Sequence, residues 1–199
     1  MKNAMKKTLA AVMALVLALS LVACGEIAKA EGAVNGLLTA LKTGDMEQVM
    51  TYTGSDELIS EEELLGGGVE VAMALFGKME YSIVSSEQVD DDTVNVTVEV
   101  TNVDMKVAMG QFMMKALEYA FSNAFADPQP TEEETTAAMI GMLGEVINDP
   151  EATTTTGQAT LVVNKTDAGW IVDVDDAAID VISGGIVTAA ERMEESFGG

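Results

Sequence analysis

The segment from Thr93 to Val103 alternates regularly between apolar and polar side chains, and this alternation constrains the fold more than any other feature. Because successive side chains of a β-strand point to opposite faces, the pattern predicts a strand with one buried face. Another strand is predicted from Met79 to about Val89, and Asp90–Asp92 predicts the turn between the two. The expected buried face is formed by Val94, Val96, Val98 and Val100. The expected exposed face is formed by Thr93, Asn95, Thr97, Glu99 and Thr101.

The residues ahead of this hairpin predict three short helices. Thr43-Gly44 ends the first helix, and Asp45 with Gln48 predicts a capped start for the second. A third helix is predicted from Leu64 to Phe76, with Gly66-Gly67-Gly68 weakening its start. The apolar face of the first helix is expected to contain Val34, Leu37, Leu38 and Leu41.

The second half of the chain predicts another hairpin and a helical insertion. Two strands are predicted, from Ala159 to Lys165 and from Trp170 to Asp175, joined around Asp167-Ala168-Gly169. Helices are expected at 106–126, 131–148 and 176–197, with Thr131 and Glu134 as a capping pair for the second and an interruption at Gly184-Gly185 in the third. A loop is expected at 149–157. The predicted fold class is therefore α+β, with N-terminal helices packed on a curved antiparallel sheet of two hairpins. A helical insertion at 106–148 separates the hairpins.

The N-terminal segment resembles the signal peptide of a bacterial lipoprotein. Lysines at 2, 6 and 7 precede an uncharged apolar run from Leu9 to Ala23, whose length fits a signal peptide better than a membrane span. The run ends in Leu21-Val22-Ala23-Cys24, which resembles a lipobox. This resemblance implies that Cys24 receives a diacylglyceryl group and becomes the first residue of the mature protein. An uncleaved anchor and a plain secretory signal are the alternatives.

We therefore expect a lipoprotein signal peptide at 1–23, a tether at 24–32 and a single α+β domain at 33–199. Two acyl chains give stable membrane residence, so the expected location is the extracytoplasmic face of the cell membrane. Loss of residues 1–23 removes three of the ten basic residues and no acid, which leaves seven bases against 33 acids and a formal charge of about −26. Such a charge repels phosphate backbones, so no nucleic-acid partner is expected.

Three stretches resemble those of uncharacterised lipoproteins from Gram-positive anaerobes that belong to the nuclear-transport-factor-2-like, or cystatin-like, superfamily. They are Ala33 to Asp45, Val96 to Asp104, and Lys165 with Gly169-Trp170. The resemblance implies a curved sheet that forms an open cone, often with dimers through the sheet. Enzymes of the superfamily use a carboxylate and a phenol in that cone. The candidates here would be Tyr52, Tyr81, Tyr119 and Asp104.

The composition excludes several kinds of catalytic site. The chain has no histidine, and its only thiol is assigned to the lipid, so Ser-His-Asp, Cys-His and His-containing zinc sites are excluded. The glycines at 66–68 lack the Lys-Ser/Thr of a phosphate loop. Two acidic clusters, Asp90–Asp92 and Asp173 with Asp175 and Asp176, do not match a calcium loop. The first is interpreted as a hairpin turn, and the second as a strand end followed by a helix cap. No enzyme activity, metal or cofactor is therefore predicted, and Trp170 is interpreted as a packing residue.

The inserted helices are rich in methionine. Met105, Met109 and Met113 recur at every fourth position, and Met114, Met139 and Met142 lie nearby. A copper(I) site would use such thioethers, but an adaptable apolar core has the same pattern and is the favoured interpretation. The helices either cover the sheet or form a soft groove for a partner. We expect the space beneath them to be filled by the side chains of Met109, Phe112, Met113 and Leu117.

These observations predict a non-catalytic binding or interaction module with an unknown protein or small-molecule partner. The alternative is a carrier of a small apolar ligand or a cation in a cavity of the sheet. An exposed apolar patch on the inserted helices would favour the interaction module. A polar-lined cavity would favour the carrier.

Overall fold

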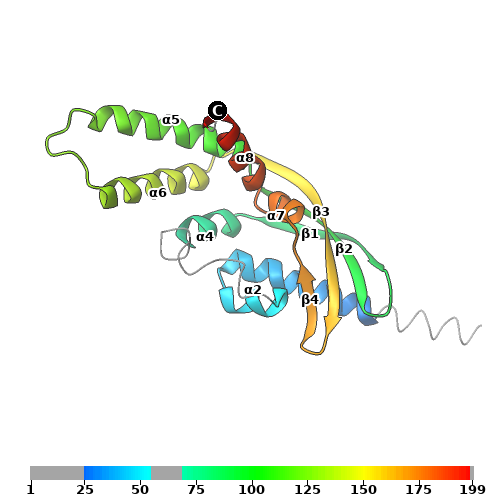
Figure 1. Cartoon of the computed structure of the whole chain (residues 1–199). Coiled ribbons are helices and arrows are strands. Elements are labelled where there is room, and N and C mark those ends of the chain that lie inside the picture. Colours follow the sequence, from blue (N-terminus) through cyan, green and yellow to red (C-terminus); the bar gives the residue numbers. More distant parts are fainter. Residues whose placement is uncertain (1–24, 55–68, 198–199) are drawn as a thin grey trace, which may run out of the picture.

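The computed structural model describes residues 25–54 and 69–197 of the chain (Figure 1). Within these ranges, helices precede a four-stranded antiparallel sheet, which confirms the predicted α+β class and the N-terminal position of the helices. The strands are β1 (Glu80–Gln88), β2 (Thr93–Val103), β3 (Thr154–Thr166) and β4 (Gly169–Asp173), in that order across the sheet. The signal peptide, the lipobox residues Leu21, Val22 and Ala23, and Cys24 lie outside the described residues.

The strand pair β2–β3 forms the centre of the sheet. The four valines of the predicted face, from Val94 to Val100, are buried, while the alternate positions from Thr93 to Thr101 are partly or fully exposed, as the alternation predicts. Val96 pairs with Leu161 of β3, which is also buried, so both strands contribute to the same core. The strand β3 starts at Thr154, inside the predicted loop 149–157. The threonines continue the pairing with β2 because β-branched residues favour a strand when a partner strand is present.

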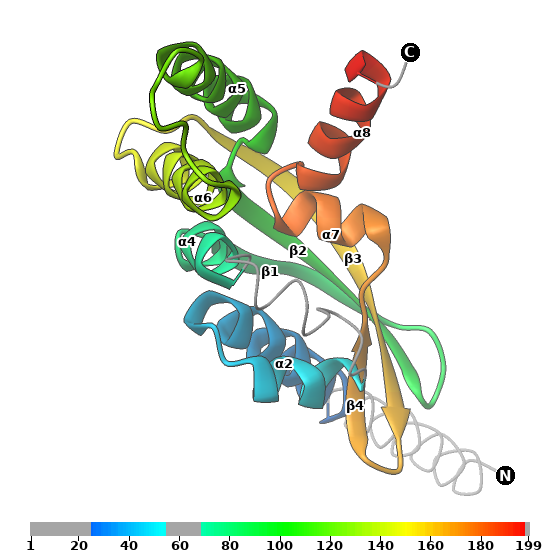
Figure 2. The same ribbon diagram turned by 60° about the vertical axis from the view of Figure 1, so that its left-hand side comes forward.

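The N-terminal helices pack on one face of this sheet (Figure 2). The first described helix covers residues 25–43 and ends at Gly44, whose positive φ of 72° fits the predicted helix end. Asp45 then caps α2 (Met46–Thr53) by accepting a hydrogen bond from the backbone N–H of Gln48 at 3.1 Å. The helix α4 (Val69–Gly77) covers the second half of the predicted third helix. The rest of that helix lies outside the described residues.

The predicted tether is helical over the residues that the structure describes. Residues 25–32 belong to the first helix, and Ala30 is fully buried in the main core. The prediction relied on small and polar residues, but these side chains also suit a helix that packs closely on a sheet. An ion pair between Glu26 and Lys29, 3.0 Å apart, adds to the first turn. The folded domain therefore begins earlier than the expected residue 33.

Two short helices follow the sheet and are fixed to it by a buried asparagine. Asp175 caps α7 (Asp176–Ile182) through the N–H of Ala178 at 2.8 Å, and α8 covers Ile186–Phe197. The amide of Asn102 on β2 donates to the backbone oxygen of Ile182 at 3.0 Å. The chain turns between α7 and α8 at Gly184 and Gly185, both with positive φ.

The insertion forms a helical hairpin that extends from one end of the sheet (Figures 1 and 2). Its helices are α5 (Met105–Asn123) and α6 (Glu132–Asn148). Thr131 and Glu134 form a complete capping box at the start of α6, as the sequence predicts. At its base the hairpin shares a second core with α4 and α8, which includes Leu75, Val103, Met105, Val146, Ile147 and Ala189.

Candidate docking surface on the helical hairpin

The helix α5 has two apolar faces, of which only one is packed. Met105 and Ala108 are buried at the base, and Phe112, Ala116 and Tyr119 are half-buried along the same side. The other side contains Val107, Met114 and Phe121, which lie within about 40° of one another around the helix axis at 3.6 residues per turn. Their side chains are 39%, 68% and 76% exposed. The outer face, defined as Val107, Met114, Leu117 and Phe121, is therefore an apolar surface with no covering element among the described residues.

The exposed apolar surface continues to the tip of the hairpin. Phe125, just after α5, is 96% exposed, and Leu117 is 54% exposed. Single exposed apolar residues are common, but a continuous row of large ones marks an interaction site. The row from Val107 to Phe121 measures about 21 Å along the helix axis. This is the exposed patch that favours the interaction module.

A groove lies beside the outer face, between α5 and α8. Its volume is about 380 Å³, and its lining consists of Lys106, Met109, Gly110, Met113, Leu117, Ala189, Arg192 and Met193. The expectation that Met109, Met113 and Leu117 fill the space beneath the inserted helices is therefore wrong on this side. The reason is tertiary, because α5 and α8 diverge from a common base (Figure 2). The other side of this groove, α8, was not identified from the sequence, although Ile186, Ala189 and Met193 recur at helical spacing.

An ordered carboxylate lies near Lys106, one of the residues that line this groove. Asp180 accepts hydrogen bonds from the backbone N–H of Thr188 at 2.9 Å and from its hydroxyl at 2.7 Å. Burial alone would raise the pKa of Asp180, but these two hydrogen bonds and the nearby charge of Lys106 hold the pKa below its usual value. Asp180 thus connects the two helices that follow the sheet and balances part of the charge of Lys106.

The carboxylate and phenol candidates for an enzyme are dispersed over the fold. Tyr81 lies on β1, where its hydroxyl is 3.0 Å from that of Thr39. Tyr52 packs against the main core and crowds Gly36 of the first helix. Tyr119 lies on α5, and Asp104 caps α5 through the N–H groups of Lys106 and Val107. Tyr52 lines a surface pocket of about 330 Å³ together with Asp45, but Asp45 is engaged as the cap of α2, where it accepts a hydrogen bond from the backbone N–H of Gln48.

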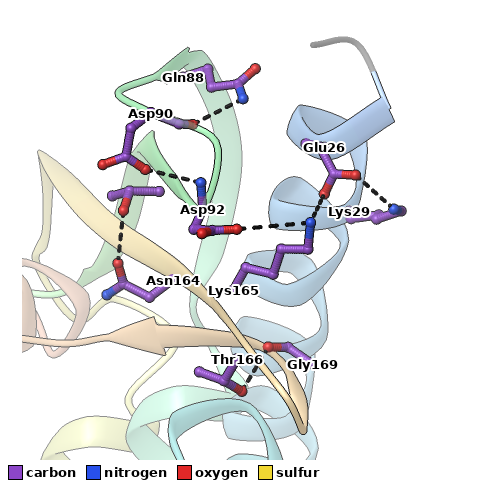
Figure 3. A network of polar contacts seen from close by, with 10 residues as sticks. Glu26, Lys29, Gln88, Asp90, Asp92, Asn164, Lys165, Thr166 and Gly169 are labelled. Atoms are coloured by element: carbon purple, nitrogen blue, oxygen red, sulfur yellow. Dashed lines mark hydrogen bonds and ion pairs between the residues drawn. The ribbon is translucent and has the colours of Figure 1, made fainter. Parts of the chain in front are cut away.

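The Asp90–Asp92 cluster has a structural role in the β1–β2 turn (Figure 3), and Asp175 of the second cluster caps α7. In the β1–β2 turn, Asp90 accepts a hydrogen bond from the backbone N–H of Asp92 at 2.9 Å. Lys165 lies 3.5 Å from Glu26 and 3.9 Å from Asp92, so it connects this turn to the first helix. Hydrogen bonding with Lys29, against a smaller opposing effect of burial, lowers the pKa of Glu26. Within the described part of the chain, no group of three or more carboxylates has the geometry of a metal site.

Two further features bear on ligand binding. Trp170 is half-buried against the main core, in agreement with its interpretation as a packing residue. A separate cavity of about 150 Å³ lies between the first helix, α2, α4 and α7, with an almost entirely apolar lining that includes Leu37, Leu41, Val49, Phe76 and Ile179. This volume falls below the range of about 300–1,000 Å³ that is typical of ligand pockets. None of the helices within residues 25–54 and 69–197 combines the length and the hydropathy of a membrane span.

Comparisons with known proteins give a structural similarity but no match in sequence. No protein-family model matches the sequence, and no curated protein does so. The crystal structure of ycdA, a candidate lipoprotein from Bacillus subtilis, aligns with 72% of this chain at 15% sequence identity and a TM-score of 0.45. The aligned part represents 44% of the ycdA chain, so the present chain spans less than half of that protein.

Proposed function

We propose that this chain is a non-catalytic interaction module, held by a lipid on Cys24 at the extracytoplasmic face of the cell membrane, that docks a protein on the outer face of α5. The observation that carries this proposal is the exposure of Met114, Leu117 and Phe121 opposite the packed side of their helix. Large apolar side chains exposed in a row are stabilised when a partner removes them from water. Methionine adapts to the shape of the partner.

The position of the proposed anchor favours a protein partner over a lipid surface. The first described helix starts at residue 25, directly after Cys24, and its start and the hairpin tip lie at opposite ends of the molecule (Figures 1 and 2). Because the helix packs on the sheet from its first turns, a lipid on Cys24 would hold the hairpin tip away from the bilayer. A partner on the outer face would then approach from outside the membrane.

We also propose that the domain belongs to the nuclear-transport-factor-2-like type, with helices on one face of a twisted antiparallel sheet. In that case the N-terminal helices and α7 fill most of the cone, and the cavity of about 150 Å³ is the remainder. This cavity is the observation that favours the second candidate function, a carrier of a small apolar ligand. It has room for a compact apolar molecule but for few of the polar groups that orient a larger one.

Mass spectrometry of the protein purified from its own membrane tests the anchor and the carrier together. The proposal predicts a mature chain that starts at Cys24 with a diacylglyceryl group, and no stoichiometric small molecule on the domain under native conditions. A Cys24→Ala variant should remain as the full-length precursor. An unmodified Cys24 in the wild-type protein would refute the anchor, and a retained small molecule would favour the carrier.

A further inference from the structure

One half of strand β3 forms an open edge of the sheet. The hairpin partner β4 pairs with β3 only from Val162 to Thr166 (Figure 2), while β2 pairs with it from Thr154 onward. In the described part of the chain, no strand pairs with the second side of residues 154–161, which we call the open edge. This half of β3 is regular, because its register against β2 has no shift.

The open edge presents a regular set of backbone groups to a further strand. The N–H of Asp104 donates to the backbone oxygen of Thr153 at 2.8 Å, so residue 153 directs its backbone groups toward the β2 side. Because these groups alternate in direction along an antiparallel strand, the following residues of odd number do the same. The N–H and C=O groups that point away from β2 belong to Thr154, Thr156, Gln158 and Thr160.

This edge lacks the features that protect most exposed strands. Natural edge strands are very short or carry charges, proline or bulges, because an unprotected edge pairs with other chains. The outer strand β1 has Glu80, Glu87 and a register shift between Ile83 and Ser85, and β4 has only 5 residues. Residues 152–164 instead contain no charge and no proline, in a chain with 33 acidic residues. The open edge is therefore suited to pairing with an added strand.

The position of α7 argues against a second copy of this chain as the added strand. A Cβ at Gly157 would lie 3.2 Å from the side chain of Val181, so α7 lies over the middle of the open edge. The two-fold register that pairs the whole edge sets Gly157 against its own copy, with the strands about 4.8 Å apart. The two copies of α7 would then lie over adjacent strands, although packed helix axes need about 8–10 Å. An extended segment without such a helix meets no such conflict.

The charges around the open edge favour a basic segment. Glu151 precedes the strand, and Asp173 on β4 pairs with Val162, so exposed carboxylates lie at both ends of the edge. The charge of Lys106 is already offset in part by Asp180. The full chain has a formal charge of −23, so lysine or arginine on an approaching strand is attracted and glutamate is repelled.

We propose that an extended, basic segment of a partner protein pairs with the open edge of β3 and extends the four-stranded sheet by one strand. This second interaction surface does not depend on the outer face of α5. Hydrogen bonds to the outward-directed backbone groups of β3 supply the affinity. Apolar side chains on one face of the segment lie beside the partly exposed Val181 of α7, and basic side chains lie on the other face, where Glu99 of β2 is exposed.

The test measures binding of labelled peptides of about nine residues to the full-length protein in detergent by fluorescence anisotropy. The probe alternates valine and lysine. Residues that exchange hydrogen bonds across two antiparallel strands have side chains on the same face, so the lysine N–H groups face β3 when the valines face α7. We expect N-methylation of two lysine amides to weaken binding about tenfold or more, and N-methylation of two valine amides to weaken it at most about twofold.

Charge and the protein edge are tested separately. A peptide of valine and glutamate should bind more weakly than the lysine peptide, with the difference reduced at high salt. Gln158→Pro removes one outward-directed N–H and leaves the pairing with β2 in place. Gln158→Thr is the matched control, because both substitutions remove the hydrogen bond of 3.1 Å from Gln158 to Glu99. We expect Gln158→Pro to lose binding of the lysine peptide and Gln158→Thr to retain it.

The inference is wrong if the two methylated peptides bind equally, if the glutamate peptide binds as tightly as the lysine peptide, or if a folded Gln158→Pro variant binds like the wild type. It is also wrong if sedimentation shows a dimer of the wild type that Gln158→Pro dissociates, because the open edge would then pair with a second copy. The methylated peptides need no variant, so they decide the question if Gln158→Pro does not fold. None of these outcomes changes the proposal for the outer face of α5.

Discussion

Substitution of an aspartate into each face of β2 tests the register of the central strand. Val96 has no exposed surface and lies opposite Leu161, which is equally buried. Burial of a valine side chain contributes about 1.5–3 kcal/mol, and an uncompensated buried charge costs about 3–5 kcal/mol. We therefore expect Val96→Asp to lower the free energy of unfolding by at least about 4 kcal/mol, a large part of the about 5–15 kcal/mol typical of a domain.

Thr97→Asp on the opposite face is the matched control. The hydroxyl of Thr97 shares a hydrogen bond of 3.0 Å with that of Thr160 on the exposed side of the sheet. Its loss costs about 1 kcal/mol, since water replaces the partner. Urea unfolding followed by circular dichroism measures both variants, and Val96→Ala, with an expected loss of about 2 kcal/mol, replaces Val96→Asp if that variant does not fold. Equal losses for Val96→Asp and Thr97→Asp would refute the register.

Three further predictions concern the turns and charges of the fold. Gly184→Ala should cost about 3 kcal/mol in urea unfolding, because Gly184 has a φ of +74° and its added Cβ would clash with the backbone oxygen of Val103; a loss no greater than that of an exposed helical substitution would contradict the turn geometry. Thr188→Val removes a hydrogen bond to Asp180, whose pKa is lowered, so the variant should have a lower free energy of unfolding than the wild type at neutral pH. This gap in stability should narrow as the pH falls below about 4, because the Asp180 carboxyl becomes protonated in both proteins. A gap that does not change with pH would contradict this role of Asp180. Lys165→Ala should lower stability in urea unfolding, and part of the loss should persist at high salt, because the Glu26 oxygen that pairs with Lys165 at 3.5 Å is buried, whereas the pair with Asp92 is exposed; a loss that disappears at high salt would show that both ion pairs act only at the surface.

The sequence predicts the parts of this fold that depend on local pattern. The alternation in β2, the caps at Asp45, Asp175 and Thr131, and the left-handed end at Gly44 all rest on the chemistry of a few adjacent residues. The start of β3 was missed because the threonines form a strand only when β2 is available as a partner. The helix at 25–32 was missed because close packing on a sheet, as for Ala30, leaves little local signal.

The candidate docking surface was predictable in composition but not in shape. The methionines of α5 indicate an adaptable apolar helix from sequence alone. Whether they fill a core or line a groove depends on the direction of α8, and that direction is set by the turn at Gly184 and Gly185. Arg192 and Met193 therefore enter the site through tertiary structure, more than 70 residues after the α5 side chains that they face.

Photo-crosslinking in intact cells tests the central claim most directly. A photoreactive phenylalanine analogue at Phe121 reports on the outer face of α5, and the same analogue at Ala137 reports on the exposed side of α6. We predict one discrete protein adduct from position 121, lost when Leu117→Glu is added, and none from position 137. Adducts to phospholipid at position 121, or equal yields from the two positions, would contradict a protein-docking surface held away from the membrane.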